Sequence, residues 1–156
     1  MGASLSRPAS RTAAARLLVA VLWAGTLWAL GYVAAPAVFA QVPSAVAGDV
    51  VAVLLTRLGW VSIGCAVLML VLVRLSPDLD ARRRRSLNLF VLAMLACALV
   101  MWAGLQPAMA QLREATGDVG VRASPYWTQF AVMHGVSQLF HVIESVLAAF
   151  LVLKSR

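Results

Sequence analysis

Residues 130–153 read FAVMHGVSQLFHVIESVLAAFLVL, which is long and apolar enough to cross a lipid bilayer. The bilayer core offers no water to the peptide groups, so such a stretch must form a helix that satisfies its own backbone hydrogen bonds. It nevertheless carries two histidines, a glutamine, two serines and a glutamate. Lipid cannot solvate these groups, and the stretch therefore predicts a helix that packs among other membrane helices.

The polar side chains of this helix share one face. At about 100° per residue, six positions fall within an arc of about 120°. They are His134, Ser137, Gln138, His141, Glu144 and Ser145. We predict that all of these except Ser145 form a candidate ligand or proton site that faces the interior of a helix bundle.

Depth along the helix restricts the chemistry of this site. His134 and His141 stand about 10 Å apart along the axis, too far for their nitrogens to share one metal ion. His141 and Glu144 are one turn apart and could share an ion or a proton. A carboxyl group near the bilayer middle must be neutral or partnered, and Trp23 and Thr26 are expected as its hydrogen-bond neighbours.

Metal and cofactor chemistry is not predicted. The methionines and the two cysteines, Cys65 and Cys97, are ligand types for copper(I), but they form no compact motif. The cysteines fall in apolar runs and are expected to be buried free thiols. The chain also lacks the short motifs of serine hydrolases, zinc proteases, nucleotide-binding loops and thiol oxidoreductases, and we therefore predict that it is not an enzyme.

The chain has four apolar stretches, at residues 17–40, 51–73, 87–108 and 126–153, and the last of these contains the stretch quoted above. Hydrophobic residues make up 62% of the 156 and charged residues 12%, against about 25% charged in soluble domains. The predicted fold is all-α, an integral membrane four-helix bundle of two consecutive antiparallel helical hairpins. Residues 1–16 form a basic tail, residues 17–153 the membrane domain, and residues 154–156 a basic end.

The placement of basic residues predicts the orientation. The net charge of +7 comes mainly from the N-terminal tail, Arg74, the run Arg82, Arg83, Arg84 and Arg85, and the C-terminal end. Such residues favour the cytoplasmic side, so both termini are predicted to be cytoplasmic in a bacterial inner membrane. The arginine run could contact anionic lipid, and nucleic acid is not an expected partner. Cleavage of the first stretch after Val38-Phe39-Ala40 is the rival interpretation, but its apolar run is longer than a typical signal core.

Two prolines stand near the ends of predicted spans. Pro36 should bend the first helix, and Pro107 should bend or end the third. Residues 36–41, PAVFAQ, are echoed by PAMAQ at 107–111, and GWVS at 59–62 is echoed by HGVS at 134–137. These echoes hint at two related hairpins. Gln106 is expected to anchor the following loop, and Arg57 to extend outward or pair with Asp49.

The longest of these motifs resemble a known family. They are LWAGTLWALGYVAAPAVFAQVPSAVAG at 22–48, GLQPAMAQLRE at 104–114 and MHGVSQLFHVIESVL at 133–147. Together they resemble the bacterial membrane proteins grouped as domain of unknown function 4149, whose eukaryotic relatives include transmembrane protein 205. The resemblance implies four membrane helices and no established activity. It singles out Pro36, Phe39, Gln106, Pro107, His134, Gly135 and Ser137 as family-motif positions.

Two functional hypotheses follow. The first is a transport-related or small-ligand- or ion-binding protein that uses the polar stripe, with a homo-oligomer or membrane partner completing the path. The second is a structural or accessory membrane protein whose stripe only packs helices together. They differ in whether His134, His141 and Glu144 line a cavity that water can enter.

Overall fold

The computed structural model describes residues 7–117 and 120–156, and these ranges contain helices and turns but no strand. In chain order the elements are α1 (Arg7–Trp28), η1 (Ala29–Ala34), α2 (Ala35–Gln41), α3 (Ser44–Leu75), α4 (Ala81–Leu99), η2 (Val100–Leu105), α5 (Gln106–Glu114), η4 (Val121–Ala123) and α6 (Trp127–Ser155). Within the described ranges, four helical segments are long and apolar enough to cross a membrane. The predicted all-α fold with four spans is confirmed, and the chain is a multi-pass membrane protein.

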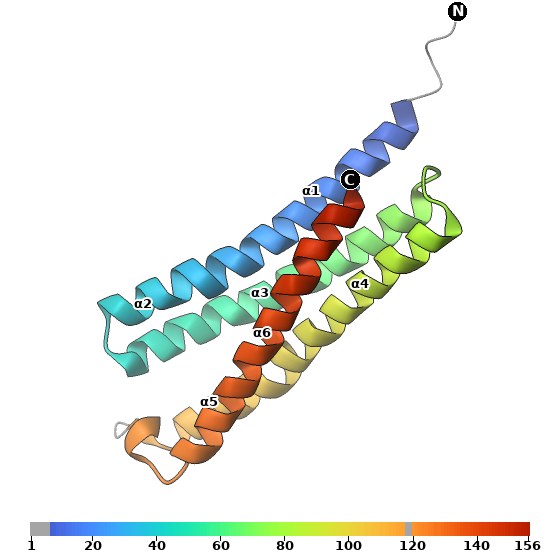
Figure 1. Cartoon of the computed structure of the whole chain (residues 1–156). Helices are drawn as coiled ribbons and strands as arrows, with labels where there is room; N and C mark the ends of the chain where they lie inside the picture. The colour runs from blue at the N-terminus through green and yellow to red at the C-terminus, as the bar shows by residue number, and fades with distance from the viewer. Residues whose placement is uncertain (1–6, 118–119) are drawn as a thin grey trace, which may run out of the picture.

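The molecule consists of four long helical rods (Figure 1). The first rod is α1, η1 and α2 in continuous succession, the second is α3, the third is α4, η2 and α5, and the fourth is α6. The α1 rod packs against α3 and α6, and α4 packs against the same two helices. The four rods therefore enclose a common interior. The start of α1, the end of α6 and the turn between α3 and α4 lie at one end of the molecule, and α2 and α5 lie towards the other (Figure 1).

Each of the two interrupted rods contains a six-residue π-helix directly before a proline segment. The N–H of Ala35 bonds to the carbonyl of Leu30, and the N–H of Gln106 bonds to the carbonyl of Met101. Pro36 and Pro107 follow at the same position of the next α-helix. The wider turn accommodates a residue that lacks an N–H and would clash with a carbonyl one turn earlier.

These π-turns lengthen the spans beyond the predicted ones. The helix with Pro36 continues to Gln41, and α3 begins at Ser44, so the expected connection of residues 41–50 is two residues long. The helix with Pro107 likewise continues to Glu114 instead of ending near residue 108. Residues 7–16, expected as a basic tail, are helical.

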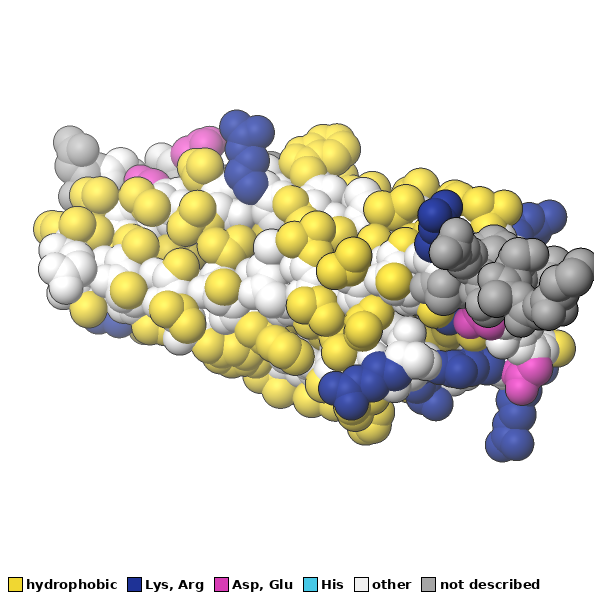
Figure 2. Space-filling view, turned by 90° about the horizontal axis from the view of Figure 1, so that it is seen from above, with side chains coloured by type: hydrophobic (Ala, Val, Ile, Leu, Met, Phe, Trp, Pro, Cys, Tyr) yellow, Lys and Arg dark blue, Asp and Glu magenta, His cyan; other side chains and the backbone are white. Residues whose placement is uncertain are grey.

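The interior is filled by large apolar side chains that exclude lipid. Trp23, Leu27, Met69, Met94 and Leu151 are fully buried. The outward faces remain apolar, as they must in contact with lipid tails. Figure 2 shows hydrophobic side chains along the length of the bundle, with Lys and Arg side chains gathered mainly towards one end.

Charged groups at that end fasten the helices to one another. The guanidinium of Arg16 is 1% exposed, forms an ion pair with Asp78 at 2.7 Å and donates to the hydroxyl of Ser76. Arg83 donates to the carbonyl oxygens of Lys154 and Arg156. The hydrogen bonds from Arg16 hold the pKa of the Asp78 carboxyl below its usual range.

Asp78→Asn should lower the free energy of unfolding by about 2 kcal/mol, because it leaves the buried charge of Arg16 without its counterion. The estimate is below that for a fully buried pair because the Asp78 side chain is 26% exposed. Since the folded pKa of Asp78 is lowered, its stabilisation is present at neutral pH and is lost as the pH falls below about 4. Thermal unfolding in detergent at several pH values measures both effects.

Asp49→Asn is the matched control. Its carboxylate is 74% exposed and lies 3.5 Å from Arg113, so the loss should stay within about 0.5 kcal/mol. Equal losses in the two variants at neutral pH would contradict the assignment of Arg16 and Asp78 as a fastening pair.

Candidate functional site

The structure divides the polar stripe of α6 into a buried part and an exposed part. The buried side chains are Ser137, His141, Glu144 and Ser145. His134 and Gln138, which sequence analysis placed in the same site, are exposed. His134 lies near the start of α6 and stacks on Phe130 at 6.1 Å, while Gln138 lies at the edge of the polar arc. Of the five residues predicted for the site, Ser137, His141 and Glu144 have their side chains buried in the bundle interior.

Glu144 lies near the centre of the apolar span formed by α6. It stands ten residues before Lys154, or about 15 Å along the helix, which is half of a hydrocarbon core of about 30 Å. Its side chain is 4% exposed, and Oε1 has no hydrogen-bond partner among the described residues. The expected neighbours do not bond to it, because Trp23 donates to Ser62 at 3.0 Å and Thr26 donates to backbone carbonyls of its own helix.

His141 is inserted between α6 and the first π-helix. A Cβ added at Gly31 would lie 1.9 Å from Nε2 of His141, so the imidazole occupies the space that a side chain would take. The ring of Tyr32 packs edge-on against His141 with 5.3 Å between ring centroids, and its hydroxyl donates to Ser145 at 3.0 Å. Nε2 of His141 has no partner among the described residues. Glycine in η1 is thus what allows the close approach.

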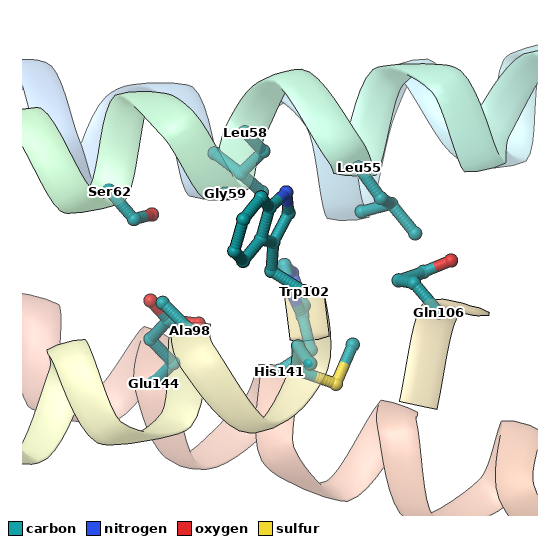
Figure 3. Close-up of a pocket in the computed structure, with 10 residues that line it drawn as sticks. Leu55, Leu58, Gly59, Ser62, Ala98, Trp102, Gln106, His141 and Glu144 are labelled. Carbon is teal, nitrogen blue, oxygen red and sulfur yellow. The ribbon is translucent and has the colours of Figure 1, made fainter. Parts of the chain in front are cut away.

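A cavity of about 20 Å³ lies beside these groups. Its polar lining comes from Ser62, Gln106, His141 and Glu144 (Figure 3). The space exceeds the 10–15 Å³ or so that one water molecule needs, so a single water-sized species fits. Ser62 accepts the Trp23 N–H, and its own hydroxyl proton remains available to donate into the cavity.

Trp102 and Gln106 lie between this cavity and a larger, open groove. Both residues also line the groove, which has a volume of about 600 Å³ and lies beside α3 and α5. The indole of Trp102 lies against Gly59, where an added Cβ would be 2.5 Å from Cδ1, and packs edge-on against Trp60 at 4.9 Å. Gln106 was expected to anchor a loop, but it is 7% exposed and lies inside a continuous helix.

Sequence reasoning missed three of the residues that shape the site. Tyr32 and Trp102 were given no role from the sequence, because no local pattern distinguishes them from the other aromatic residues of the spans. Ser62 lies in the GWVS echo of HGVS, so the repeat gave a signal for it. Gln106 was singled out through the family motif alone.

Metal ligands are not gathered in this part of the molecule. Throughout the described residues, no group of three His, Cys, Asp or Glu side chains is placed to hold a metal ion. Cys65 and Cys97 are free thiols, the first buried and the second half-buried. The chemistry that the site offers is therefore that of a carboxyl, an imidazole, a hydroxyl and an amide.

The family described as domain of unknown function DUF4149 matches residues 18–118, well over half of the chain. The chain belongs to the DUF4149 family. No curated protein and no solved structure matches the chain. The DUF4149 match contains Ser62, Trp102 and Gln106 and ends before α6, which supplies His141 and Glu144.

Gly31→Ala should destabilise this DUF4149 protein by about 2–3 kcal/mol, because the new methyl group and the imidazole of His141 require the same space. The double variant Gly31→Ala/His141→Ala should recover much of that loss, since the two changes are coupled. The coupling is measured by thermal unfolding in detergent of wild type, Gly31→Ala, His141→Ala and the double variant.

Gly25→Ala is the control in the same helix, because an added Cβ there meets nothing within 4 Å. It should be neutral or slightly stabilising, as alanine favours helix over glycine. Additive losses in the double variant would contradict the ring-on-glycine contact.

Proposed function

We propose that this DUF4149 protein binds a proton or a single small ion at the membrane midplane, and that this binding serves transport across the membrane. The observation that carries the proposal is the unpaired Oε1 of Glu144 beside a cavity of water-molecule size. Ionisable groups within membrane spans are expensive, and they commonly mark ion or proton pathways. A group kept only for packing would be expected to use its hydrogen-bonding atoms.

The chemistry of the lining supports a proton or small ion over a larger ligand. Glu144 can hold or release a proton, and the imidazole of His141 one turn away offers a second proton acceptor. Ser62 and Gln106 can complete the hydrogen bonds of one water molecule or hydronium ion between them. A volume of about 20 Å³ leaves no room for an organic substrate.

Access from one side would run through the groove behind Trp102 and Gln106. Both side chains line the groove as well as the cavity, so movement of either would join the two spaces. At the opposite end the interior is filled by apolar residues such as Met69, Val73 and Leu151. The groove side is therefore the shorter route to Glu144.

The proposed location is a bacterial inner membrane with both termini in the cytoplasm. Arg16, Arg74 and the run of arginines from Arg82 to Arg85 lie at the end that holds the termini, as the bias of basic residues to cytoplasmic loops requires. Arg84 is occupied by the carbonyls of Arg74 and Ser76. Arg82 and Arg85 are exposed, and they support contact with anionic lipid at this surface.

The rival is a protein whose polar stripe only joins helices. Two contacts between helices favour it, since Tyr32 bonds to Ser145 and Trp23 bonds to Ser62, while Ser137 bonds within α6 to the carbonyl of His134. None of the three uses Glu144 or Nε2 of His141. A packing role explains the hydroxyl groups of the stripe but leaves the two most costly groups unexplained.

Glu144→Gln should abolish proton handling while keeping the shape of the side chain. In vesicles that enclose a pH-sensitive dye, wild type should speed the collapse of an imposed pH gradient, and the variant should match empty vesicles. The infrared carbonyl band of a protonated carboxyl should change with pH in wild type and be missing in the variant. The band reports binding, and the dye reports transport.

His134→Gln is the control on the same helix, because His134 is exposed and lies away from the cavity. It should leave both readouts as in wild type. A Glu144→Gln variant that matches wild type in both assays would contradict the proposed proton site, and a lower thermal stability in that variant would favour the packing role.

A further inference from the structure

The groove of about 600 Å³ combines apolar and cationic lining residues. It lies between the outer half of α3 and the rod formed by η2 and α5, towards the end of the bundle opposite the chain termini. Its polar side chains are Thr56, Arg57, Gln106 and Arg113. Its apolar walls come from Ala52, Val53, Trp102, Pro107 and Ala110.

The groove has an excess of positive charge. Arg57 is exposed within an apolar span and forms no ion pair with any residue that the structure describes. Asp49, one expected partner of Arg57, lies 3.5 Å from Arg113 instead, and its carboxylate is 74% exposed. An exposed pair of this kind is weak, so Arg113 remains available to a second anion.

The depth of Arg57 along its span indicates that the anion is a lipid headgroup. Arg57 and Arg74 are both on α3, seventeen residues or about 26 Å apart along the axis. The hydrocarbon core is about 30 Å thick. With Arg74 at one interface, Arg57 therefore lies at the headgroup boundary of the opposite leaflet. Arg113 is seven residues beyond Gln106 on its own rod and lies farther towards the water.

We propose that this groove is a binding site for one anionic phospholipid, whose phosphate lies between Arg57 and Arg113 and whose glycerol and upper chains lie against Ala52, Val53 and Pro107. Arginine is suited to phosphate because its planar guanidinium donates two hydrogen bonds at once. The hydroxyl of Thr56 already donates to the carbonyl of Ala52 at 2.9 Å, so the arginines carry the recognition.

This site is separate from the surface at Arg82 and Arg85. The two lie at opposite ends of the bundle and would take lipid from different leaflets (Figure 1). It also does not depend on proton binding at Glu144, because the groove arginines do not line the small cavity. The two proposals can therefore fail separately.

The test is native mass spectrometry of the detergent-purified chain with added phosphatidylglycerol or phosphatidylcholine. Wild type should retain phosphatidylglycerol in preference to phosphatidylcholine. Arg57→Gln/Arg113→Gln should weaken phosphatidylglycerol binding by roughly thirtyfold, since each basic residue near a membrane surface contributes about a fivefold gain in affinity for anionic lipid. Arg82→Gln/Arg85→Gln removes the same charge at the other end and should leave the groove lipid in place.

Two further measurements locate and identify the anion. Phosphatidylglycerol should raise the melting temperature of wild type and of Arg82→Gln/Arg85→Gln but not that of Arg57→Gln/Arg113→Gln, whose own stability should be unchanged. Inorganic phosphate should give no comparable shift. A phosphatidylglycerol-induced melting-temperature shift that persists in Arg57→Gln/Arg113→Gln, or an equal shift of wild type with inorganic phosphate, would overturn the lipid site.

Discussion

A carboxyl group can persist in the middle of a membrane only where helices surround it, and this constraint organises the bundle. Glu144 must face the interior, which fixes the rotation of α6 about its axis and brings His141 and Ser145 with it. The remaining apolar faces of α6 are then free to meet lipid. The arrangement in which α6 contacts both α1 and α4 follows, because a single neighbour could not cover the polar face.

The two π-helices are the second determinant of the site. Each precedes a proline at the same position, and each supports a ring-on-glycine contact between different rods: His141 on Gly31 of η1, and Trp102 of η2 on Gly59. The faint sequence echo around Pro36 and Pro107 thus corresponds to a repeated backbone feature. π-turns often occur at functional sites, where they rotate side chains relative to an unbroken α-helix. Here η2 lines the cavity beside Glu144 through Met101 and Trp102, and η1 contacts His141, which also lines it.

The sequence was sufficient for the fold class because the relevant signal is local. Apolar runs near twenty residues and prolines at span ends can be read without knowing which helices touch. Proline alone indicates a bend, however, and it does not distinguish a helix end from a π-turn that continues the rod. The sequence therefore predicted a span that ends at residue 108, with Gln106 near its end as an anchor of the following loop instead of a lining residue of the cavity. The burial of Glu144 followed from helical periodicity, whereas Gly31 and Trp102 acquire their roles through contacts between rods.

The cavity and the groove share a wall, and the nature of that wall limits what can pass. The indole of Trp102 cannot shift towards α3, because Gly59 already gives it the closest approach that a backbone allows. Edge-on packing against Trp60 restrains it further. A species larger than water could reach Glu144 only if the indole left Gly59, whereas a proton could pass along the hydrogen-bonding groups of Gln106 and one water molecule without that movement. The geometry of the wall is thus consistent with the proposed binding of a proton or single small ion and would exclude a larger species while the indole stays on Gly59.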